Sequence, residues 1–192
     1  MSTIWTIPPL PAPDKKMILC YARGKEATGI DALLEGAIRE GTPALKPKLC
    51  FAVLPVSLQG DTVIFDTISV RSRGLAAFLS GCDRAVLFAA TVGSDADRLI
   101  TRAEATSPVR ALLLDAFFTE RVEALCNSFT AQYTKPENRF SPGYDDLPLG
   151  FQKNMFSLLD CPRKIGLTLG ESLLMMPTKS VTAIIGIQEG SL

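Results

Sequence analysis

The sequence contains no histidine among its 192 residues. This absence excludes a Ser-His-Asp triad, a Cys-His dyad and any metal or haem site that needs an imidazole ligand. Histidine is also the side chain whose charge ordinarily changes near neutral pH. Any chemistry performed by this chain must therefore proceed without an imidazole as acid, base or ligand.

Neither sign of charge is in excess, because 20 basic and 20 acidic side chains cancel. The sequence thus lacks the basic surplus that favours nucleic acid. It also lacks long apolar runs, since stretches such as 85–90 fall far short of the ~20 residues that span a bilayer. The opening residues have no basic leader and contain Pro8 and Pro9, unlike a signal peptide. We predict a cytoplasmic protein with no nucleic-acid partner and no membrane partner.

The cysteines are widely separated and form no Cys-x-x-Cys pair. Structural zinc sites nearly always show such local pairs, so we predict no metal site. An odd number of cysteines without a signal peptide favours a reducing compartment and free thiols. Each is expected to behave as a small buried hydrophobe. The five are Cys20, Cys50, Cys82, Cys126 and Cys161.

The amino-terminal residues 1–13 are rich in proline, which predicts an extended arm with at most one edge strand, at 4–7. Asp14 is expected to cap a helix that stops at Gly24, and a second helix is expected over 29–39. The length of the chain favours one domain. We therefore expect an arm over 1–13 followed by a single domain over 14–192.

The pattern then changes to strands. Runs at 49–56 and 62–68 predict a β-hairpin, and a short helix is expected over 72–79. The run at 85–92 is apolar on both faces, as in a central strand, and a helix is expected from Asp95.

A long helix is predicted from the capping Ser107 and from Pro108 to about residue 132, with Pro136 beyond its end. Its apolar stripe is predicted to be core. That stripe comprises Val109, Leu112, Leu113, Ala116, Phe117, Val122, Leu125 and Phe129.

Two apolar stretches at the carboxyl-terminal end, 166–176 and 181–187, predict a hairpin in the interior of the sheet, or at least one strand plus its return. The order of elements is helices, strands, a long helix and a terminal hairpin. This order is typical of an α+β fold with a mostly antiparallel sheet and flanking helices.

The loop RFSPGYDDLP, residues 139–148, is the first candidate site. Arg139 offers a fixed fork of donors suited to a carboxylate or phosphate. Gly143 permits close approach of a ligand, and Tyr144 adds a flat face and a hydroxyl. Pro142 and Gly143 fit the centre of a type II turn. The alternative interpretation is a surface turn with a helix-capping aspartate.

The second candidate is TLGESLLMMP, residues 168–177, where Glu171 and Ser172 interrupt an apolar strand run. The alternative interpretation is an edge position at which both side chains face water. The methionines of this segment are more typical of flexible core filler than of ligands.

Taken together, these two segments resemble the activation (reactivation) domain of cobalamin-dependent methionine synthase, in a stand-alone form. The family pattern is Arg-x-x-x-Gly-Tyr, then a helix, then a Glu-Ser-x-x-Met-x-Pro strand and a Ser-Val return strand. FAATVGSDADRLI and ALLLDAFFTERVEAL resemble stand-alone members more loosely, so the similarity extends over 14–187. The matching residues are Arg139, Gly143, Tyr144, Glu171, Ser172, Met175, Pro177, Ser180 and Val181.

The resemblance implies a twisted antiparallel sheet with a shallow groove for S-adenosylmethionine along its edge. It implies docking on a cobalamin-carrying methionine synthase or a related corrinoid protein. A flavodoxin-like or other donor would reduce cob(II)alamin there, and the methyl group of S-adenosylmethionine would then pass to cobalt. Such chemistry needs no acid or base from this chain, since the cofactors carry it. The resemblance therefore implies no catalytic side chain here.

By the same resemblance, Arg139 would hold the carboxylate of the ligand. The main chain of Ser141, Pro142 and Gly143 would contact the ligand, and Tyr144 would lie toward the corrinoid. Glu171 and Ser172 are expected in the shared strand. No acidic residue for the amine of the ligand is identified by motif.

Two other interpretations remain open at the level of sequence. The chain could be a non-catalytic scaffold that caps a corrinoid methyltransferase, since the family's further ligand-contacting tyrosines have no counterpart in these 192 residues. It could also be a nucleotide-binding α/β protein that uses the segment 85–94. That segment lacks a glycine-rich loop, which disfavours this interpretation.

Overall fold

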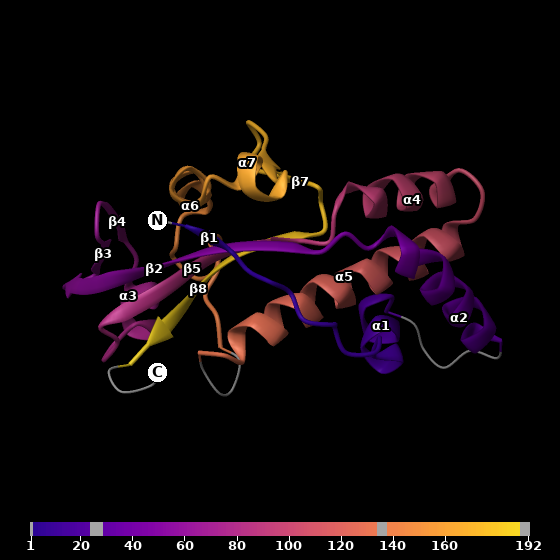
Figure 1. Cartoon of the computed structure of the whole chain (residues 1–192), viewed down its shortest axis with the longest axis horizontal. Coiled ribbons are helices and arrows are strands. Elements are labelled where there is room, and N and C mark those ends of the chain that lie inside the picture. Colours follow the sequence, from indigo (N-terminus) through magenta and orange to yellow (C-terminus); the bar gives the residue numbers. More distant parts are fainter. Residues whose placement is uncertain (1, 24–28, 134–137, 189–192) are drawn as a thin grey trace.

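The computed structural model of the chain describes residues 2–23, 29–133 and 138–188. It is an α+β fold in which helices flank a curled antiparallel sheet (Figure 1), which confirms the predicted fold class. The helices are α1 (Lys15–Tyr21), α2 (Ile30–Gly41), α3 (Arg73–Phe78), α4 (Ser94–Glu104), α5 (Pro108–Thr130), α6 (Gln152–Leu159) and α7 (Cys161–Ile165). The strands are β1 (Thr3–Ile4), β2 (Lys48–Gln59), β3 (Thr62–Phe65), β4 (Ile68–Arg71), β5 (Arg84–Thr91), β6 (Thr168–Leu169), β7 (Met175–Met176) and β8 (Ser180–Ile187).

Strand β5 lies inside the main sheet, whose order is β4-β3-β2-β5-β8, with β1 paired to the free part of β2. Every residue of β5 except Arg84 is buried, because both faces of the sheet are covered. The prediction of a central strand at 85–92 is therefore confirmed. A strand covered on both sides has no polar face, which explains its unbroken apolar sequence.

Helix α5 belongs to two apolar clusters at once. Its first half packs with α1, α2 and α4 around Leu114, Phe117 and Phe118. Its second half places Leu125 and Phe129 on one face of the sheet. Figure 1 shows α5 running from the helical end of the molecule to the sheet. Helices α3, α6 and α7 lie on the opposite face of the sheet. Helix α5 therefore connects the helical cluster at its first half with the sheet at its second half.

A buried ion pair on α5 holds the amino-terminal arm. Glu120 and Arg121 are adjacent residues whose side chains are bonded at 2.5 and 2.6 Å and are almost fully buried. Arg121 also donates to the main-chain oxygen of Pro11 at 2.6 Å and to that of Ala12 at 3.4 Å. Glu120 accepts from the main-chain N–H of Asp14, whose own carboxylate caps α1. The charges compensate each other inside the protein, and the arm supplies the remaining acceptors.

The first strands differ from their predicted limits. The run at 62–68 is divided into β3 and β4, because Asp66 adopts a left-handed backbone (φ 48°) and turns the chain between them. Aspartate is among the few residues that tolerate this conformation. The arm does form an edge strand, at β1, earlier than the predicted 4–7. Gly24 and Pro136, expected to end helices, lie outside the described residues.

The apolar stripe of α5 is core only in part. Val109 and Leu112 are 49% and 51% exposed, whereas the other six residues of the stripe are buried. The prediction for these two residues is wrong. They lie in the first turns of α5, where one side of the helix has no covering element in the described structure.

The predicted terminal hairpin in the sheet interior is also wrong. Strands β6 and β7 pair with each other in a separate two-stranded sheet, and β8 pairs with β5. A tight turn causes this, since the N–H of Leu173 donates to the oxygen of Gly170 at 3.0 Å and Leu173 has φ 64°. Of the two predicted apolar stretches, only the second forms a strand of the main sheet, namely β8, and its partner there is β5. Among the described helices, none is both long and apolar enough to cross a membrane.

Helix α2 approaches α5 closely at Gly41, where an added Cβ would lie 2.5 Å from Cε1 of Phe117. We predict that Gly41→Ala destabilises the protein by about 1–3 kcal/mol through overpacking. Gly36→Ala is the matched control in the same helix, because nothing lies within 4 Å of the added atom. It should stabilise by about 0.5–1 kcal/mol, the usual difference between these residues in a helix. Urea unfolding measures both, and equal midpoints for the two variants would contradict this view of the contact.

Candidate functional site

The RFSPGY segment lies along the outer edge of β8. The N–H of Phe140 donates to the oxygen of Ile184 at 2.9 Å, and the N–H of Ile184 donates back at 2.8 Å. The next residue but one is Pro142, which has no N–H and so cannot extend the ladder. The oxygen of Ser141 accepts from the N–H of Tyr144 at 3.0 Å, with Gly143 at φ 91°. This hydrogen bond and this φ are those of the predicted type II turn.

Arg139 connects this segment to α5. Its guanidinium forms an ion pair with Glu123 and donates to Oδ1 of Asn127 at 2.6 Å. The two partners are one helical turn apart and therefore share a side of α5. The arginine side chain is only 16% exposed. Two segments that are separate in sequence thus meet at a charged contact.

A polar row runs along this side of α5. Its members recur every four residues, and we call Asp115, Thr119, Glu123 and Asn127 the polar row. At the end of the row away from Arg139, Lys179 bonds to Asp115 at 2.7 Å and to Thr119 Oγ1 at 3.0 Å. Lys179 directly precedes β8. The polar row therefore faces a cation at each end, next to the strand that carries the RFSPGY segment. Motif reasoning missed this row, although its four-residue period is readable in the sequence.

A cavity of about 520 Å³ lies between the arm, α1 and α5, and its lining includes both partners of Arg139, Glu123 and Asn127. Asp14, Glu120 and Glu123 line it together with Tyr21, and Asn127 also contributes to its wall. Burial raises the pKa of Tyr21, and the charges of Glu123 and Glu120 raise it further. The volume lies within the range of small-molecule sites. The lining carries three carboxylates, of which Glu120 is already paired with Arg121 and Glu123 with Arg139.

Tyr144 extends from the turn into solvent. Its side chain is 60% exposed, and its ring lies edge-on to Phe140 at 6.3 Å. Gly143 beside it is exposed as well, while Pro142 is buried. The ring of Tyr144 is thus accessible from solvent, on a turn that main-chain hydrogen bonds hold.

The other end of the loop is fixed by Asp146. Its carboxylate accepts from Ser72 Oγ at 2.5 Å and from the N–H groups of Arg73 and Gly74 at 2.8 and 3.1 Å. These are the first residues of α3, so Asp146 caps a helix distant in sequence. The hydrogen bond from Ser72 is the main reason that the pKa of Asp146 is below its usual value. The helix-capping alternative is therefore correct for Asp146, next to the candidate site residues.

Glu171 and Ser172 lie elsewhere. They occupy the turn between β6 and β7, so the predicted strand placement is wrong for both. Glu171 lines a separate cavity of about 620 Å³ with Lys153, Phe156 and Asp160. Among the described residues, no hydrogen bond or ion pair joins Glu171 or Ser172 to Arg139. The structure thus brings together the RFSPGY residues and α5, but not the second motif.

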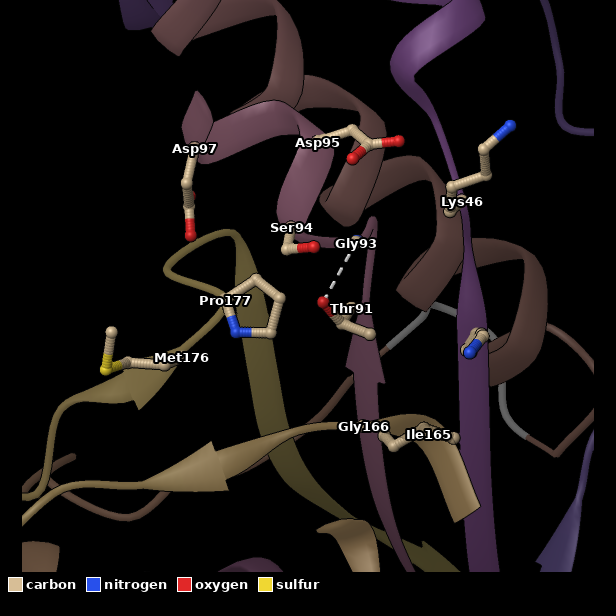
Figure 2. Close-up of a pocket in the computed structure, with 11 residues that line it drawn as sticks. Lys46, Thr91, Gly93, Ser94, Asp95, Asp97, Ile165, Gly166, Met176 and Pro177 are labelled. Atoms are coloured by element: carbon tan, nitrogen blue, oxygen red, sulfur yellow. Dashed lines mark hydrogen bonds between the residues drawn. The ribbon is translucent and has the colours of Figure 1, made fainter. Parts of the chain in front are cut away.

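A further cavity of about 400 Å³ contains none of the predicted site residues (Figure 2). It lies between the start of α4 and the segment around Pro177, with Gly166 on its lower side in this view. Among its polar groups, Thr91 Oγ1 accepts from the N–H of Gly93 at 3.1 Å. Asp97 likewise accepts from Thr178 at 2.6 and 2.9 Å. The bonds of Asp97 join α4 to Thr178, two residues before β8.

The carboxyl-terminal part of the chain, residues 123–191, matches the family model of the vitamin B12 dependent methionine synthase activation domain. This segment contains both motifs and half of the polar row. The fold is that of a reactivation domain of the methionine synthase type. A crystal structure of the MetH reactivation domain bound to AdoHcy matches it with a TM-score of 0.68 and 17% identity, over 88% of this chain and 69% of that chain. The resemblance predicted from the motifs is thus confirmed. No curated protein sequence matches the chain.

The cap on α3 predicts how the loop responds to acid. Because the folded pKa of Asp146 lies below its unfolded value, its stabilising effect is complete above about pH 4. That effect is lost as pH falls through the lower folded value. We expect Asp146→Asn to be less stable than the wild type near pH 7, and to lose less stability on acidification to about pH 2. Urea unfolding across this range measures both.

The control is Asp145→Asn, which changes the neighbouring carboxylate without removing a hydrogen bond to α3. It should retain the acid response of the wild type. An identical acid response for Asp146→Asn would show that the cap contributes nothing to folding.

Proposed function

We propose that this chain binds S-adenosylmethionine and supports the reactivation of a corrinoid-carrying methyltransferase. A cobalamin-dependent methionine synthase is the partner that the resemblance favours. The observation that carries the proposal is the position of Arg139. It belongs to the matched motif and pairs with Glu123 of α5, a residue that lines an acidic cavity of ligand size. A related fold in complex with AdoHcy, the product left after methyl transfer, supports the same ligand class.

In this proposal Arg139 binds the carboxylate of the ligand. A guanidinium has five N–H donors in a rigid fork, so it can serve Glu123 and a ligand carboxylate together. The main chain of Ser141, Pro142 and Gly143 borders the ligand, and Tyr144 faces the corrinoid. Its exposure of 60% suits such a contact.

Glu123 is our candidate for the acidic residue that the motif did not identify. It belongs to the polar row, pairs with Arg139 and lines the acidic cavity. A carboxylate there can attract the amine or the sulfonium of S-adenosylmethionine, both of which are cationic. The ligand would thus be held by opposite charges at its two ends.

The corrinoid of the partner supplies the nucleophile, and the sulfonium of the ligand supplies the leaving group. The contribution of this chain is to bring the methyl group into line, which is a proximity effect that needs no proton transfer. A chain without histidine is compatible with that role. We also propose a flavodoxin-like or other reductant as electron donor, and a cytoplasmic location.

A second candidate function is a scaffold that docks on a corrinoid protein without binding S-adenosylmethionine. Two observations favour it. Arg139 is already paired with Glu123, and Glu171 lies in a separate cavity. In that case the exposed Tyr144 and its turn would contact the partner while the cavity beside α5 stays without ligand.

Calorimetry with S-adenosylmethionine separates the two candidates. We expect the wild type to bind and Arg139→Ala to bind about 10–100-fold more weakly, the usual cost of a lost charged hydrogen bond. Arg163→Ala is the matched control, since Arg163 of α7 is 82% exposed and pairs with Asp160, the residue before that helix. It should bind like the wild type. Absence of binding by the wild type would favour the scaffold, and unchanged binding by Arg139→Ala would overturn our placement of the ligand.

A further inference from the structure

The cavity between the arm, α1 and α5 has an apolar wall that takes no part in the contacts proposed for Arg139 and Glu123. Met17 and Tyr21 line the cavity from α1. They are one helical turn apart, so they lie on the same side of that helix. Both remain accessible, with 41% and 38% of their surfaces exposed. A thioether and an aromatic ring at a cavity wall are typical of sites that take an apolar or aromatic ligand group.

The wall on α5 is made of small side chains. Ala124, Ser128 and Ala131 line the cavity there. Their spacings of four and three residues place them on one side of the helix. Small side chains on α5, together with a ring on α1, leave room between the two helices for a flat group. Such a group can stack on the ring of Tyr21.

The charged part of the cavity adjoins this wall. Glu123 and Asn127 line the same cavity, and both bind Arg139. Each directly precedes a small residue of the wall, Ala124 or Ser128, and is therefore rotated from it by roughly 100° around the helix. A ligand that crosses α5 at this level thus meets charged groups on one side and apolar groups on the other.

S-Adenosylmethionine is divided in the same way, with a charged amino-acid part and a flat, uncharged adenine. We propose that α1 supplies the adenine subsite of this cavity, in which the ring of Tyr21 stacks on the base and Met17 packs beside it. This inference rests on the proposed function, because it takes the carboxylate of the ligand to be bound at Arg139. The subsite makes Tyr21 a residue that determines specificity for a nucleoside.

The surroundings of Tyr21 keep its ring uncharged. Burial is the main cause that raises its pKa above the ordinary value, and the charges of Glu123 and Glu120 act in the same direction against that of Arg139. The side chain is therefore a neutral phenol near pH 7. A neutral ring can lie against a neutral base without the cost of burying a charge.

Calorimetry with two probes, S-adenosylmethionine and adenosine, tests the subsite. Tyr21→Leu keeps an apolar side chain without the ring, and Tyr21→Phe keeps the ring without the hydroxyl. We expect Tyr21→Leu to bind both probes about 5–100-fold more weakly than the wild type, the usual cost of a lost stack between a base and an aromatic ring. Tyr21→Phe should bind both within about threefold of the wild type, because the stacking face remains.

The matched control is Cys20→Ser, on the same helix. Cys20 is exposed, so the expectation of a buried thiol is wrong for it, and it does not line the cavity. This variant should bind both probes like the wild type. Since Tyr21 is itself partly exposed, Tyr21→Leu should fold, and its urea midpoint verifies this before binding is measured.

The outcomes distinguish this inference from the proposed function. Binding of S-adenosylmethionine that Tyr21→Leu leaves unchanged would overturn the subsite and leave the proposed function in place. Binding of adenosine that Tyr21→Leu weakens, without binding of S-adenosylmethionine, would support the subsite and contradict the proposed function. Absence of adenosine binding by the wild type, or equal loss in Tyr21→Phe and Tyr21→Leu, would refute stacking on this ring.

Discussion

The ring of Phe129 holds the sheet and the long helix together. It lies on α5, is fully buried, and contacts Trp5 of the arm, Phe51 of β2, Phe88 of β5 and Tyr133 at ring-centre distances of 5.1–5.3 Å. Each such aromatic pair contributes about 0.5–1.5 kcal/mol beyond burial of its area. With this end of α5 fixed on the sheet, the polar row of the same helix is held beside β8. The contact between Arg139 and the polar row depends on that fixed position.

The elements with complete local signals were predictable from sequence. Ser107 and Pro108 mark the start of α5, and the continuous apolar run of β5 marks a strand covered on both faces. The predictions failed where contacts between distant elements determine the burial or the pairing of a segment. Whether Val109 is covered depends on which helices reach it, and the apolar stretch of 166–176 contains a turn that its composition conceals. Local pattern specifies the type of an element better than the surface against which it packs.

The candidate site shows the same division. The turn at Pro142 and Gly143 is encoded within a few residues, so the sequence predicted its geometry. The ionic partner of Arg139 comes from α5, sixteen residues earlier, and no local motif indicates it. Glu171 was expected in a strand of the same family pattern, yet it lies in the turn between β6 and β7 and lines another cavity. Residues that belong to one sequence pattern need not lie together in the folded protein.

The described part of the arm, residues 2–13, is rich in proline, and helix α5 holds it partly through its main chain. Arg121 reaches it only through the carbonyl oxygens of Pro11 and Ala12, and proline retains this acceptor although it lacks the N–H. Every residue type carries the same oxygen at this position. At Pro11 and Ala12 the helix thus holds the main chain of the arm, so these two side chains can change while the course of the arm at this point is preserved.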